Sequence, residues 1–141
     1  MSNDTREGRE PIAPLIGLEA ATLAIMSALH LTGVLAGGTR PFSPTAAAIA
    51  EAVISVVLLG GAAALVRFPR HGRAIALAAL GFAILGVIAG LSFTIRGGGA
   101  IDIAYHATIL PLLLITLAAT SSRPSIHTAP PAPVHDSAGV C

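Results

Sequence analysis

Residues 74–95 read AIALAALGFAILGVIAGLSFTI, an apolar stretch without a single charged residue. An α-helix rises 1.5 Å per residue, so a helix of this length crosses the roughly 30 Å hydrocarbon core of a bilayer. The stretch therefore predicts a membrane-spanning helix. This prediction decides the fold class, because the rest of the chain follows the same pattern.

Three further apolar stretches are about as long, at residues 14–37, 44–66 and 101–120. Segments rich in Gly, Pro and Arg separate the four stretches, and such segments do not continue a helix. Short connections place consecutive helices side by side in opposite directions. We expect an all-α fold, an integral membrane antiparallel four-helix bundle over residues 14–120, between an N-terminal tail (1–13) and a disordered C-terminal tail (121–141).

The composition excludes several classes of protein. Hydrophobic residues make up 54% of the chain and charged residues 11%, whereas soluble domains are about 25% charged. Soluble enzymes and disordered proteins are excluded on this ground, and a net charge of +1 gives no reason to expect a nucleic-acid partner. The chain has no lysine for Schiff-base chemistry, and its one cysteine, Cys141, cannot form an intrachain disulfide.

The arginines predict the orientation. Six lie in the two tails and the 67–73 connection, which share one side of the membrane, and only Arg40 and Arg96 lie on the other. Arginine-rich segments stay in the cytoplasm, so we expect a multi-pass protein of a bacterial inner membrane with both termini cytoplasmic. The lipid bilayer is the expected partner, and a homo-oligomer or a larger membrane complex stays open. GxxxG pairs at Gly33/Gly37 and Gly86/Gly90 permit close helix approach, with a dimer face as one use.

Ionisable residues inside the spans mark the candidate site. His30, Glu51 and His106 come from three different spans, and each lies about 6–7 Å to the outer side of its span's midpoint. Because charged or titratable groups are costly in a membrane, this shared depth predicts that the three side chains form one polar site.

Two acidic residues are accessory candidates. Glu19 lies eleven residues before His30 on the same helix face and would extend the site towards the cytoplasm. Asp102 precedes His106 by four residues, so it stacks on the same face and either serves that histidine or caps the fourth helix.

Several chemistries fit these residues. His30, Glu51 and His106 suffice to bind a divalent metal, and two histidines on facing helices could ligate haem b. A chain of carboxylates and imidazoles could pass protons or act as acid and base, or the groups could simply tie helices together by hydrogen bonds. We expect a small integral membrane protein with an intramembrane polar site that handles protons or electrons, and we expect the protein to be an accessory subunit. Whether the protein is an enzyme stays open. The alternatives are a small proton-coupled exporter, with Glu19 or Glu51 as coupling carboxylate, and a structural membrane subunit.

The second span and its surroundings resemble a known group. Ala50-Glu51-Ala52 opens an apolar helix that ends in Leu58-Leu59-Gly60-Gly61, and a short basic connection leads into the third span. Over residues 45–95 this layout resembles the DoxX-like small four-helix bacterial membrane proteins. The resemblance implies a role connected with membrane redox and thiol stress, and it assigns no catalytic residue.

Overall fold

The structure is a computed structural model that describes residues 12–35 and 39–122 of the 141-residue chain. These residues form the helices α1 (Ile12–Leu31), α2 (Pro44–Arg67), α3 (Gly72–Gly97) and α4 (Ala100–Ser121). Each helix is long and apolar enough to cross a membrane, so the fold is all-helical and suggests a multi-pass membrane protein. The predicted tails lie outside the described residues, apart from the residues nearest to the helices.

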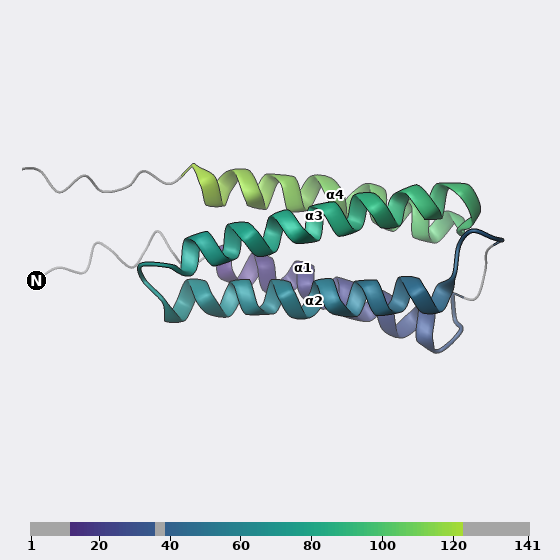
Figure 1. Cartoon of the computed structure of the whole chain (residues 1–141), viewed down its shortest axis with the longest axis horizontal. Coiled ribbons are helices and arrows are strands. Elements are labelled where there is room, and N and C mark those ends of the chain that lie inside the picture. Colours follow the sequence, from purple (N-terminus) through teal and green to yellow (C-terminus); the bar gives the residue numbers. More distant parts are fainter. Residues whose placement is uncertain (1–11, 36–38, 123–141) are drawn as a thin grey trace, which may run out of the picture.

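The helices lie side by side along one long axis, and the chain turns at alternate ends of the molecule (Figure 1). Each helix packs against the next in the chain, and α4 also contacts α1. At one end the Thr39 N–H donates to the Gly97 carbonyl at 2.7 Å, which joins the α1–α2 and α3–α4 connections. At the other end the Arg73 guanidinium donates to the Ser121 carbonyl, which holds the end of α4 to the beginning of α3.

The first helix differs from the predicted span of residues 14–37. α1 begins at Ile12 and ends at Leu31, and Gly33 follows with a φ of 74°. This left-handed conformation suits glycine and ends a helix. The midpoint of α1 therefore lies about four residues nearer to the N-terminus than expected, and His30 belongs to the last turn. α2 begins as predicted, where Pro44 takes the first helical position and the Ser43 hydroxyl accepts from the Ala46 N–H at 3.4 Å.

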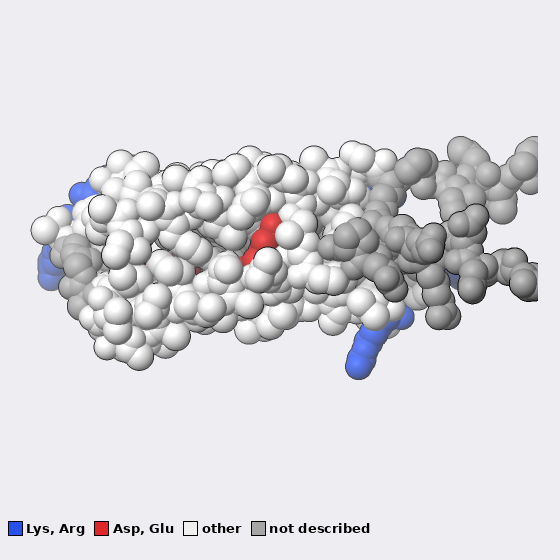
Figure 2. Space-filling view, turned by 180° about the vertical axis from the view of Figure 1, so that it is seen from behind, with Lys and Arg blue, Asp and Glu red and all other residues white. Residues whose placement is uncertain are grey.

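The acidic and histidine side chains of the helices are buried, and many large hydrophobic side chains are exposed. Large hydrophobic residues are exposed on every helix, for example Leu18 at 63% and Leu85 at 69%. Figure 2 shows a face that has no charged residues apart from basic ones at its ends and a small acidic area near the middle. A soluble monomer rarely exposes so much apolar surface. Inside, the packing rests on fully buried residues from all four helices: Ile16, Leu23, Leu58, Leu80 and Leu113.

Two glycines of α3 let its neighbours approach closely. A Cβ at Gly86 would lie 2.6 Å from Ile54 Cδ1 on α2, and a Cβ at Gly90 would lie 2.9 Å from His106 Nε2 on α4. This GxxxG pair therefore serves contacts within the chain, where small residues permit close helix packing. The other predicted pair includes Gly37, which lies outside the described residues.

Candidate functional site

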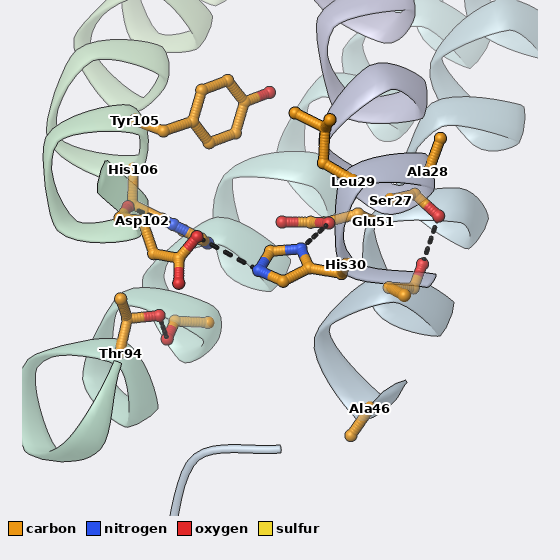
Figure 3. A network of polar contacts seen from close by, with 12 residues as sticks. Ser27, Ala28, Leu29, His30, Ala46, Glu51, Thr94, Asp102, Tyr105 and His106 are labelled. Carbon is orange, nitrogen blue, oxygen red and sulfur yellow. Dashed lines mark hydrogen bonds and ion pairs between the residues drawn. The ribbon is translucent and has the colours of Figure 1, made fainter. Parts of the chain in front are cut away.

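A histidine on α1 lies between two carboxyl groups from two other helices (Figure 3). His30 Nδ1 is 2.9 Å from Glu51 Oε2 on α2, and His30 Nε2 is 3.1 Å from Asp102 Oδ1 on α4. The residues are buried, with exposed fractions of 4%, 3% and 2%. We refer to His30, Glu51 and Asp102 as the triad. It forms because the last turn of α1 and the first turn of α4 lie at the same end of the molecule as the beginning of α2, and Glu51 lies two turns inside α2.

The two hydrogen bonds of the triad require two protons, one in each bond between a ring nitrogen and a carboxyl oxygen. A neutral imidazole ring has only one N–H, so the second proton either makes the ring an imidazolium or belongs to a carboxylic acid. An imidazolium between two carboxylates and a neutral imidazole between a carboxylate and a carboxylic acid therefore carry the same single net negative charge. A third proton would make the triad neutral, which is the cheaper state in a hydrocarbon surrounding.

The two carboxyl groups have different surroundings. Asp102 lies in the first turn of α4, where free backbone N–H groups favour a negative charge. Glu51 lies two turns inside α2, and its Oε1 is buried without a hydrogen-bond partner in the described chain. The arrangement therefore offers Glu51 Oε1 as the position for a third proton, with the negative charge on Asp102.

The second histidine is joined to the triad through the main chain. His106 Nδ1 is 2.8 Å from the Asp102 carbonyl oxygen. A carbonyl only accepts, so Nδ1 carries the proton, and in the neutral ring Nε2 then has a free lone pair. Nε2 points at Gly90 of α3, where the missing side chain makes room for the ring.

The structure brings together part of the predicted site. The expected meeting of His30 and Glu51 is observed, but the second hydrogen-bond partner of His30 is Asp102, and His106 is joined to the group through the Asp102 carbonyl. The reason is the early end of α1, which places His30 about 6 Å farther from the midpoint of its helix, towards the outer end, than the predicted span implied. That displacement is about one helical turn, the distance from His106 back to Asp102. Asp102 therefore does not cap α4 with its side chain.

The predicted accessory residue Glu19 lies in a separate polar contact. The Thr116 hydroxyl donates to Glu19 Oε1 at 2.6 Å, while Oε2 is buried without a partner in the described chain. Tyr105, three residues after Asp102 on α4, shares a 3.2 Å hydrogen bond with the Thr22 hydroxyl on α1. The expected extension from the triad to Glu19 is therefore not a continuous line of hydrogen bonds among the described residues.

The predicted metal ligands do not form a metal site among the described residues, and the haem alternative stays a prediction. Both ring nitrogens of His30 face carboxyl oxygens, so binding a metal ion or haem iron would require this histidine to lose one of its two contacts. Over residues 12–35 and 39–122, no group of three or more His, Cys, Asp or Glu has the geometry of a metal site. The set His30, Glu51 and His106 is therefore not a metal centre in this structure.

A cavity of about 340 Å³ adjoins the triad between α2 and α3. Its polar lining residues are Ser43, Glu51, Thr94 and His106, and the other described lining residues are apolar residues, glycines and Pro41. A larger, shallower hollow of about 490 Å³ lies elsewhere between the same helices and is lined only by apolar residues and glycine. The smaller cavity therefore has the chemistry of a binding site, few polar groups in an apolar wall.

Sequence reasoning missed Thr116 and Thr120, two buried hydroxyl residues of α4. The signal was present in the helical period, since the buried residues of α4 recur at spacings of three and four. Starting from Asp102 and His106, that period leads to Ile109, Leu113, Thr116 and Thr120.

Comparison with known proteins gives no relative: no protein-family model, curated protein or solved structure matches the chain.

Proposed function

We propose that the protein is an integral membrane antiparallel four-helix bundle of a bacterial inner membrane, and that it binds and releases protons at the triad. Both termini would be cytoplasmic, because Arg67, Arg70 and Arg73 lie in one connection and only Arg40 and Arg96 in the opposite ones. The triad then lies in the outer half of the membrane. The resemblance to DoxX-like proteins stays a prediction.

One observation carries the proposal: His30 has a carboxyl group on each ring nitrogen, in a site that is almost completely buried. A histidine needed only to tie two helices together would be satisfied by one acceptor and one donor. Two carboxyl partners instead create a group whose net charge changes with each proton, within a surrounding that resists net charge. Such a group takes up or releases a proton when another charge arrives beside it or leaves.

Infrared difference spectroscopy tests this proposal on the full chain in lipid nanodiscs. Between alkaline and acidic buffer we expect the carbonyl band of a carboxylic acid to appear, and Glu51→Gln to abolish it or shift it strongly. Asp102→Asn should also displace the titration, because it removes the negative charge on the other side of the ring.

Glu19→Gln is the matched control, since Glu19 is an equally buried carboxyl group outside the triad. It should leave the titrating band in place. The proposal fails if the wild-type protein shows no titrating band, or if the band survives Glu51→Gln and Asp102→Asn unchanged.

A further inference from the structure

The described residues that line the cavity beside the triad include hydrogen-bond acceptors and neither lysine nor arginine. Glu51 and His106 line it together with Thr94. Glu51 Oε1 has no partner in the described chain, and His106 Nε2 has a lone pair because Nδ1 donates to a carbonyl. The Thr94 hydroxyl already donates to the Gly90 carbonyl at 2.9 Å, so it too presents only lone pairs. A ligand that supplies N–H or O–H donors fits these three acceptors, and Ser43, the remaining polar lining residue, adds a hydroxyl that can donate or accept.

Aromatic rings contribute to the same wall. Phe42 and Phe93 line the cavity, and they are two of the four phenylalanines in the chain. The face of an aromatic ring attracts a cation, by roughly 0.5–2 kcal/mol depending on desolvation. The remaining wall consists of small and branched apolar residues, which suit a hydrocarbon body.

The charge of the triad favours a cation over a neutral donor. With two protons the triad has one net negative charge, and either a third proton or one bound monovalent cation compensates it. Glu51 from α2 and His106 from α4 are the titratable groups among the described lining residues, and the lining residues of α3 include none. Behind them lie His30 and Asp102, which complete the triad, and Tyr105, whose ring contacts that of His106. An anionic ligand would add to the uncompensated charge.

We propose that this cavity binds a small organic cation, an ammonium group on an apolar body, in exchange for the third proton of the triad. The inference rests on the proposed proton-binding function and assigns a ligand class to the same site. The ammonium group donates to Glu51 Oε1 and to His106 Nε2, while its apolar body lies against Phe93. Binding expels one proton, so proton and cation compete for Glu51.

Benzylammonium is a suitable probe, with benzyl alcohol as the neutral compound of nearly the same shape. Titration calorimetry of the nanodisc-embedded full chain, in buffers of different ionisation enthalpy, should show release of about one proton per bound benzylammonium. Benzyl alcohol should bind far more weakly and release none. Equal binding of the two compounds, or binding without proton release, overturns the proposal.

Three variants locate the site. Glu51→Gln should weaken benzylammonium binding about tenfold or more, and Glu19→Gln should leave it unchanged. Phe93 is half-exposed, and Phe93→Leu leaves every titratable group in place. Because this variant removes the aromatic ring that attracts the cation, it should reduce the preference for benzylammonium over benzyl alcohol. An unchanged preference in Phe93→Leu together with unchanged affinity in Glu51→Gln refutes the assignment.

The two proposals fail separately. A triad that titrates in the infrared spectrum but neither binds benzylammonium nor releases a proton on its addition refutes only the ligand assignment. A triad that does not titrate refutes the proton-binding function, whatever the calorimetry shows.

Discussion

Replacing His30 by alanine is the most direct test of the triad. The substitution removes the two contacts of 2.9 and 3.1 Å and leaves two buried carboxyl groups without their partner. Hydrogen bonds between membrane helices average about 0.6 kcal/mol and reach about 1.7 kcal/mol. Because both contacts involve an ionisable carboxyl group in a nearly dry site, we place each near the upper value. His30→Ala should therefore lower the free energy of unfolding by about 3 kcal/mol.

Ser27→Ala is the matched control at the same helix interface. The Ser27 hydroxyl donates to the Ala48 carbonyl on α2 at 2.7 Å and is as buried as His30, but it makes a single neutral contact. Its removal should cost about 0.6 kcal/mol. Unfolding in mixed detergent micelles, followed by the helical circular dichroism signal, measures both values.

The cause of the loss can be separated from simple loss of packing. Adding Glu51→Gln and Asp102→Asn to His30→Ala removes the uncompensated carboxyl groups, and this combination should recover part of the lost stability. If His30→Ala costs no more than Ser27→Ala, or if the two amide substitutions lower the stability further, the triad does not hold the helices as described.

Three further predictions concern other parts of the molecule. Gly61→Ala places a Cβ 2.8 Å from a side-chain carbon of α3 and should cost about 1–3 kcal/mol, whereas Gly60→Ala, with nothing within 4 Å, should change the unfolding free energy little; equal costs would contradict this packing. Thr116→Val removes the 2.6 Å hydrogen bond to Glu19 and should lower stability by about 1 kcal/mol without moving the infrared titration of the triad. Cys141, the only thiol in the chain, should react with a membrane-impermeant maleimide in inverted vesicles and stay unlabelled in intact spheroplasts; the reverse pattern would refute the predicted orientation.

The sequence predicted the helices well because their signal is local. Four apolar stretches between Gly-, Pro- and Arg-rich segments need no tertiary information, and the ends of α2, α3 and α4 lie within two residues of the expected ones. The end of α1 was wrong by six residues, because an apolar stretch continues past the point where Gly33 leaves the helical conformation. Hydropathy shows how long an apolar stretch is, but it does not show where the helix within that stretch ends in a turn.

The sequence by itself also determined which residues were candidates, since ionisable groups in apolar spans stand out one by one: Glu19, His30, Glu51, Asp102 and His106. Only the tertiary structure decided their partners. A hydrogen bond requires agreement within a few tenths of an ångström, whereas one helical turn is 5.4 Å. The shift of α1 by about one turn therefore exchanged His106 for Asp102 beside His30. It also left His106 Nε2 and Glu51 on the wall of a cavity that no pattern in the sequence revealed.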